Sequence, residues 1–386
     1  MRRTWKCETQ TPTNSTSPAT SLVIRLIRLS WVSVAACLAL SASVQAQAVG
    51  TLQPHSVRTL AHLNRPEPPL KEIFATPPRP QDVCLGKAAS QDAAISACST
   101  LIQGGERWRH SQGPAYGRRA EAHRSQGSID AALADFDRAI KLEPKKAGHY
   151  AGRGLAYLEL RDTDRAIRDF GQAIALDPRN ATAFKRRAQA HRVAGSPDRA
   201  VADYDAAIRI NPKDADAHLQ RGFTYRELHD SARALDDFGR VAELDGDRML
   251  GHYHRAAVLF EMRRYDRAIR DLDRAINASP DHAPSFNLRG QAYAATGETR
   301  RAIQDLDQAV QLDGNFAEAF VNRGNIFQST NKWERALADY GEAVRLKPQD
   351  AYSLYSRGLA MRALGREEEA QIDIAKAKEI EPGIGP

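Results

Sequence analysis

The chain has 386 residues, of which 42% are hydrophobic and 27% charged, and its formal net charge is +7. This composition is ordinary for a soluble protein and argues against a membrane transporter and against wholesale disorder. The length predicts several domains or an array of repeats, and an aromatic content of only 7% beside abundant Ala favours helices over strands.

Residues 1–48 have the layout of a secretory signal peptide. A basic region is followed by an apolar stretch at 29–42, which is too short for an unaided membrane span, and by small-residue cleavage sites at 44–48. We therefore expect a secreted, periplasmic chain without a stable membrane span after signal removal. The alternative is a membrane anchor, formed by an uncleaved signal or by lipidation of Cys37 in a lipobox-like sequence.

Two segments precede the periodic part of the chain. Residues 49–80 hold seven prolines and little periodicity, which predicts an extended linker. Residues 81–112 are predicted to form an N-terminal capping segment, because apolar residues recur at helical spacing between 90 and 103. This segment contains Cys84 and Cys98. In an exported chain such a pair favours a disulfide over a zinc site, which needs four ligands, and two buried free thiols are the alternative.

A 34-residue period runs through the rest of the chain. Counted from Gly113, eight units end at Ile384, with Gly or Ala at position 8, Ala at position 20 and a large apolar residue at position 24. Small side chains let two helix backbones approach, the bulky residue fills the space between them, and Pro or Gly at position 32 ends the second helix.

This pattern resembles the tetratricopeptide repeat family, whose unit is a pair of antiparallel helices. The resemblance covers residues 113–384 and implies an all-α fold, a right-handed α-solenoid of eight helix-turn-helix units.

The units depart from the family pattern at position 7, where the family usually has Leu. All eight units carry Arg there and Asp at position 23. Both positions are equidistant from the turn near position 15, so we expect a bidentate ion pair that fixes the helix register. The pairing can lie within one unit or extend to the next. A charged strip that grips a ligand is the alternative, disfavoured because a binding surface rarely needs the same residue in every unit.

Positions 2, 5, 9 and 12 form one stripe of each first helix and vary between units. In the family this stripe lines a groove that receives peptides or partner helices. The basic and aromatic side chains of the stripe suit an acidic or amphipathic segment of a protein partner. The candidate groove residues are Lys185, Gln189, Arg192, Leu219, Phe223, Arg226, Tyr253, Phe260, Tyr352, Tyr355 and Arg362.

Signatures of catalysis are missing from the sequence. It contains no Gly-rich phosphate loop, nucleophile elbow or His-Glu-x-x-His helix, and His252 and His254 point to different helix faces. We therefore predict a non-catalytic protein-interaction scaffold without cofactor or metal. The alternatives are an accessory subunit of an envelope enzyme and an RNA-binding helical-repeat protein. Acids in or near the stripe and the export signal disfavour RNA, and no nucleic acid is expected as a partner.

Overall fold

The computed structural model describes residues 79–86, 90–244 and 248–385, which belong to one compact unit, Pro77–Pro386. The predicted signal at 1–48 and nearly all of the predicted linker at 49–80 lie outside the described residues. All secondary structure within these ranges is helical. None of the described helices combines the length and the apolar character that a membrane crossing requires.

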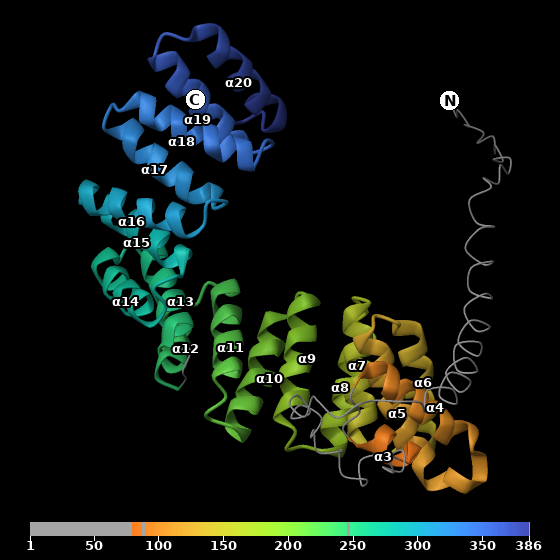
Figure 1. Ribbon diagram of the computed structural model, residues 1–386. Coiled ribbons are helices and arrows are strands. Elements are labelled where there is room, and N and C mark those ends of the chain that lie inside the picture. The colour runs from red at the N-terminus through yellow and green to blue at the C-terminus, as the bar shows by residue number, and fades with distance from the viewer. Residues whose placement is uncertain (1–78, 87–89, 245–247, 386) are drawn as a thin grey trace, which may run out of the picture. The chain divides into compact units, whose positions relative to one another are not determined.

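The helices follow one another in pairs (Figure 1). A short pair comes first, consisting of α3 (Pro80–Leu85) and α4 (Gln91–Gln103), and a 3-10 turn η1 (Gly105–Trp108) leads into the longer helices. These are α5 (Arg109–Ser125), α6 (Ile129–Leu142), α7 (Ala147–Glu159), α8 (Thr163–Leu176), α9 (Ala181–Val193), α10 (Pro197–Ile210), α11 (Ala215–Glu227), α12 (Ser231–Leu244), α13 (Arg248–Glu261), α14 (Tyr265–Ala278), α15 (Ala283–Ala295), α16 (Thr299–Leu312), α17 (Ala317–Ser329), α18 (Trp333–Leu346), α19 (Ala351–Ala363) and α20 (Glu367–Ile380).

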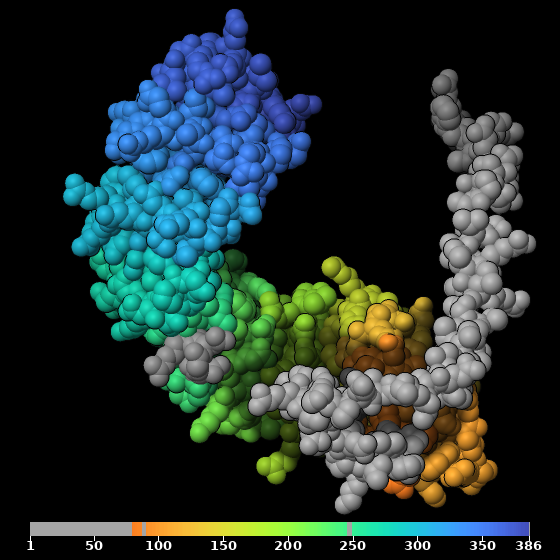
Figure 2. All heavy atoms as spheres, viewed as in Figure 1, coloured from red at the N-terminus to blue at the C-terminus, as the bar shows by residue number. Residues whose placement is uncertain are grey.

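Each odd-numbered helix from α5 onward packs against the even-numbered helix that follows it, and each such hairpin packs on the next. The atoms of neighbouring hairpins fill the space between them in the space-filling view (Figure 2). The described chain is therefore all-α and has the architecture of an α-solenoid, as the period predicts. One boundary differs: α5 begins at Arg109, four residues before Gly113, because η1 passes directly into the helix.

Packing inside a hairpin explains the small and bulky positions of the repeat. A Cβ added to Gly222 would lie 2.8 Å from the ring of Phe238, and one added to Gly324 would lie 2.8 Å from the ring of Tyr340. Both rings are fully buried. The residue at position 8 must therefore be small because the bulky residue at position 24 of the same hairpin occupies the space beside it.

The turn of every long hairpin contains one residue in the left-handed backbone region, at position 15. Four of these residues are glycines, which adopt this conformation without a steric cost. The other four carry side chains and have φ values of 55 to 59°: Arg161, His229, Arg263 and Asn331.

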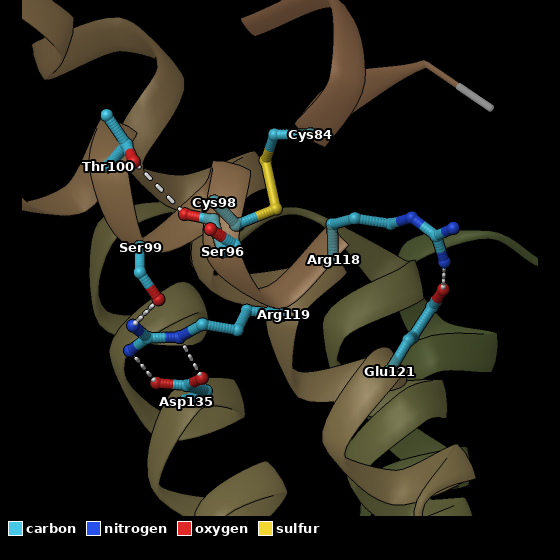
Figure 3. The surroundings of a disulfide bond; sticks show 9 residues. All are labelled: Cys84, Ser96, Cys98, Ser99, Thr100, Arg118, Arg119, Glu121 and Asp135. Carbon is cyan, nitrogen blue, oxygen red and sulfur yellow. Dashed lines mark hydrogen bonds and ion pairs between the residues drawn. A yellow bond between two sulfur atoms is a disulfide. The ribbon is translucent and has the colours of Figure 1, made fainter. Parts of the chain in front are cut away.

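A disulfide joins the two helices of the capping segment. Ser90 caps the start of helix α4, where its hydroxyl accepts a hydrogen bond from the backbone N–H of Ala93 at 3.1 Å. The bond between Cys84 and Cys98 links α3 to α4 (Figure 3). Both cysteines are fully buried, and with Leu101 they pack against α5. The predicted disulfide is thus present, and α4 lies on the first long hairpin.

An ion-pair ladder joins the helices of every long hairpin. The Arg at position 7 donates from Nε and Nη2 to both carboxylate oxygens of the Asp at position 23 in the same hairpin, so the pairing within one unit is the one that forms. In the fourth unit these distances are 2.8 and 2.7 Å, between Arg221 and Asp237. The pairs are Arg119–Asp135, Arg153–Asp169, Arg187–Asp203, Arg221–Asp237, Arg255–Asp271, Arg289–Asp305, Arg323–Asp339 and Arg357–Asp373.

The same arginines also connect neighbouring hairpins, through a position that the sequence analysis did not single out. Where position 25 of the preceding unit is Asp, the remaining Nη1 donates to it at 2.5 to 2.6 Å. Where that position is Gly, as at Gly171, the link is missing from the described ion pairs. The position 7 Arg is therefore a structural clamp, and its second contact varies along the array.

Candidate functional site

The first helices of the last hairpins border two adjoining cavities. One, of about 390 Å³, is lined by residues of α15, α17 and α19, and the other, of about 320 Å³, adds Phe260 of α13. Gln291 and Asn322 line both cavities. We call this continuous surface the amide groove, after the four side-chain amides that border it: Asn287, Gln291, Asn322 and Asn325.

Hydrogen bonds fix three of the four amides in place. Asn322 donates to the Oδ1 of Asn287 at 2.9 Å, and Asn287 is itself buried. The Oδ1 of Asn325 accepts from the hydroxyls of Tyr340 at 2.7 Å and Tyr352 at 3.2 Å. Each amide has both donors and an acceptor, so the groove retains groups of both kinds for a ligand.

Charged residues at the edge of the amide groove neutralise one another. Lys347 donates to Glu318, and this hydrogen bond lowers the pKa of Glu318 and raises the pKa of Lys347. Asp350 caps the start of α19, where it accepts from the backbone N–H of Ser353 at 2.8 Å. The apolar residues Phe316 and Val321 complete the lining of the larger cavity. The groove is thus apolar and amide-rich, with Lys347 and Glu318 paired and Asp350 held by the start of α19.

The predicted residues of α9 lie in a different place. Lys185 and Gln189 line a small polar cavity of about 180 Å³. Burial opposes the charge of Lys185, but hydrogen bonds to Asp216 at 2.8 Å and Asp214 at 3.2 Å outweigh it and raise the pKa of the ammonium. Arg192 pairs with Glu227 in the next hairpin. The cations predicted here are therefore already matched by carboxylates.

The predicted residues of α11 and α13 take part in packing between hairpins. Phe223 lies edge-on to Phe238 and to His254, with ring centroids 5.4 and 4.7 Å apart, and Leu219 belongs to the same cluster. Tyr253 contacts His254 and His282, and its burial raises the pKa of its hydroxyl. Burial first, and then the charges of Arg226 and His282, lower the pKa of His254 to about 4.

The remaining predicted residues divide between the amide groove and its surroundings. Phe260 and Tyr352 line the groove, and Tyr352 is 48% exposed. Tyr355 packs beside the terminal Ile384. Arg226 pairs with Glu261, and Arg362 lies 3.2 Å from Glu367.

The four amides are the residues that the sequence prediction missed. The available signal was a run of Asn and Gln at positions 5, 6 and 9 of the sixth and seventh units. Among the described residues, no group of three or more His, Cys, Asp or Glu side chains is arranged to hold a metal ion.

Comparisons with known proteins identify the family. Tetratricopeptide repeat profiles match residues 151–215, 203–236 and 251–282, and a TPR repeat profile matches residues 120–160, 290–331 and 324–365. Together these matches cover more than half of the chain. The helix-pair architecture and the profiles define an α-solenoid repeat protein, and the chain belongs to the tetratricopeptide repeat family.

A solved structure with a TM-score above 0.5 shows the same fold. The C-terminal part of a TPR repeat-containing protein from Cytophaga hutchinsonii is 14% identical, with a TM-score of 0.53, over 62% of this chain and 98% of that one. A tetratricopeptide repeat protein from Parabacteroides merdae is 20% identical, with a TM-score of 0.48, over 68% of this chain and 98% of that one. A search of curated proteins finds no significant match.

Proposed function

We propose that the protein is a non-catalytic interaction scaffold that binds an extended peptide segment of a protein partner in the amide groove. The observation that carries the proposal is the continuity of two cavities, of about 390 and 320 Å³, across successive first helices. Each volume falls within the range of established ligand sites.

The chemistry of the groove favours an extended main chain as the ligand. A peptide backbone offers one N–H and one C=O per residue, and a side-chain amide complements both. Phe260 and Tyr352 are the aromatic anchors at the two cavities, and apolar side chains of the ligand pack between them. The residues of α9, α11 and α13 predicted from sequence lie outside these cavities, except Phe260.

Charge pairing argues for a protein rather than a nucleic acid. Strong nucleic-acid binding requires cations that neutralise several phosphates. The stripe cations Lys185, Arg192 and Arg226 each contact a carboxylate of this chain. The stripe therefore offers these cations to no phosphate, and it gives the RNA-binding alternative little support.

We also propose that the protein works in an oxidising compartment, the periplasm, either free or anchored at its N-terminus. The buried Cys84–Cys98 disulfide supports this location, because such bonds persist in oxidising environments. Fractionation of cells that express the full chain tests it, and recovery in the cytoplasm with both thiols reduced would count against it.

The binding proposal is tested with linear peptides selected from a random display library against the full chain. Their affinities are measured by fluorescence anisotropy for the parent and for a variant carrying Gln291→Ala and Asn322→Ala. The matched control carries Gln304→Ala and Gln308→Ala on α16, the second helix of the same hairpin as Gln291.

We expect the groove variant to bind about tenfold more weakly, because it loses two amide hydrogen bonds to the peptide. The control variant should bind like the parent and unfold at the parent's denaturant midpoint, whereas the midpoint of the groove variant should fall slightly, because Asn287 loses its hydrogen bond from Asn322. Equal affinities in the groove variant and the parent would place the interface outside the amide groove.

A further inference from the structure

A second surface, on α14 and its neighbours, concentrates arginine. Two cavities of about 330 and 370 Å³ lie here and share Arg267. Six arginines and three aspartates line them: Arg255, Arg263, Arg264, Arg267, Arg270 and Arg274, with Asp236, Asp266 and Asp271. We call these six arginines the arginine surface. Arg267, Arg270 and Arg274 lie on the second helix α14 and Arg255 lies on the first helix α13, whereas the amide groove is bordered mainly by first helices.

Comparison between repeat units shows why Arg267 differs from its counterparts. In the second unit, Arg165 at the same position pairs with Asp162 and lies over the ring of Tyr157, 4.5 Å from its centroid. In the fourth unit, the corresponding Arg233 pairs with Asp230 at 2.5 Å and lies 4.4 Å from the centroid of Tyr225. In three of the six units that carry it, this arginine is held both by an acid three residues earlier and by an aromatic ring.

The fifth unit lacks both partners. Arg264 stands where the acid would be, and Leu259 stands where the aromatic ring would be. Arg267 and Arg270 are exposed, and neither makes an ion pair within the described ranges of the chain. Two like charges three residues apart on a helix repel each other. The local charge therefore favours an anionic ligand.

The aspartates of the surface do not offset this charge. Asp271 is buried and is shared between Arg255 at 2.7 Å and Arg274 at 3.2 Å. Asp236 and Asp266 are exposed carboxylates at the border of the cavities. Six guanidinium groups thus face three carboxylates, and one of those three is already saturated.

Apolar groups lie beside the arginines and narrow the choice of ligand. Leu235 and the buried Leu259 line the first cavity, and Tyr265 lines the second. Leu235 and Tyr265 are only half-buried, and a nucleic acid backbone would leave their remaining apolar surface uncovered. A peptide with an apolar side chain between carboxylates fills both needs, because guanidinium groups bind carboxylates bidentately.

We propose that the arginine surface is a second docking site, for an acidic protein segment in which an apolar side chain is flanked by carboxylates. The proposal does not depend on the amide groove, because it rests on other residues and other chemistry, although helix α13 contributes Phe260 to the groove and Arg255 to this surface. A partner bound here and a peptide bound in the amide groove contact different residues of the array.

The test measures binding of a labelled synthetic peptide in which a leucine lies between pairs of glutamates. The surface variant carries Arg267→Gln and Arg270→Gln. The matched control carries Arg165→Gln and Arg168→Gln at the same repeat positions of the second unit, so that both variants lose the same charge. An analogue with serine for leucine and a single-stranded DNA oligonucleotide are the further probes.

The expected result is binding to the parent that weakens with salt and is about tenfold weaker in the surface variant, through the loss of two charge contacts. The control variant should retain the parent's affinity, and the serine analogue should bind more weakly than the leucine peptide. No binding to the parent, equal weakening of both variants, or equal binding of the serine analogue would overturn the proposal. Tighter binding of the oligonucleotide would also overturn it and indicate nucleic acid as the ligand.

Discussion

Replacement of Arg221 by Ala is expected to destabilise two neighbouring hairpins together. The guanidinium binds Asp237 of its own hairpin at 2.7 Å and Asp205 of the preceding hairpin at 2.5 Å. Asp237 is only 3% exposed, so the substitution leaves a buried carboxylate without its counter-ion. Breaking a buried pair in this way costs about 3 to 5 kcal/mol. We expect about 3 kcal/mol, because His218 still contacts Asp237 at 3.0 Å.

The chain contains a natural comparison for this change. Arg187 binds Asp203 in the same way, but Gly171 occupies the place of the second aspartate. Arg187→Ala should therefore lower the free energy of unfolding by up to about 1 kcal/mol less than Arg221→Ala does. This difference is the contribution of one exposed ion pair. Replacement of both Arg221 and Asp237 by Leu should recover much of the loss, because an apolar contact replaces the pair. Urea unfolding followed by far-UV circular dichroism measures all of these differences.

The pH dependence distinguishes a lost ion pair from a simple packing defect. Burial raises the pKa of Asp237, but hydrogen bonds from Arg221 and His218 outweigh it and hold the pKa below its ordinary value. In the parent, the stability from this lowered pKa is present above the unfolded pKa and is lost as the pH falls through the folded one. Without Arg221 burial dominates, the pKa rises, and protonation relieves the unpaired charge. The difference in free energy of unfolding between parent and variant should therefore become smaller as the pH falls. A difference that does not change with pH, or no difference at all, would refute the reasoning.

Two other substitutions and reduction of the disulfide test separate features. Gly171→Asp should stabilise the protein by about 0.5 to 1 kcal/mol, because a Cβ there lies 3.7 Å from Nη1 of Arg187 and a new ion pair can form. An equal gain in a protein that also carries Arg187→Ala would contradict this explanation. His254 has a folded pKa of about 4, below the unfolded value of about 6.5, so stability is lost as the pH falls through that window. His254→Phe should remove up to about 3 kcal/mol of this loss in urea titrations at several pH values, and an unchanged pH profile would show that the histidine is solvated. Reduction of the Cys84–Cys98 bond should destabilise the capping segment by about 3 kcal/mol, as measured by thermal melts with and without reductant, and identical melts would exclude the contribution.

Much of the fold could be predicted from the sequence, because each repeat position has one dominant physical requirement. Gly222 must be small since the ring of Phe238 occupies the space beside it, and the 34-residue period repeats that requirement along the chain. The equidistance of positions 7 and 23 from the turn likewise predicted their ion pair. The disulfide was expected from the two cysteines that follow the predicted signal peptide.

The candidate site was less predictable. Two stripe residues, Phe260 and Tyr352, line the cavities, but the stripe positions did not show that Lys185 and Arg192 are paired with acids of neighbouring hairpins. Those acids lie about 30 residues away in sequence, at positions with no constant residue type. The stripe positions consider one helix at a time and leave out the acids of neighbouring hairpins. They therefore overestimated the net positive charge of the surface.

The sequence by itself determined the helix pairs, their period and the residues that hold each pair together, because these depend on contacts inside one repeat. Only the tertiary structure decided which arginines reach across to the preceding hairpin, which cations are neutralised and which amides meet in one groove. Those properties depend on the distances between side chains of different repeats. The spacing of residues along the chain fixes the first kind of contact and leaves the second to the stacking of the hairpins.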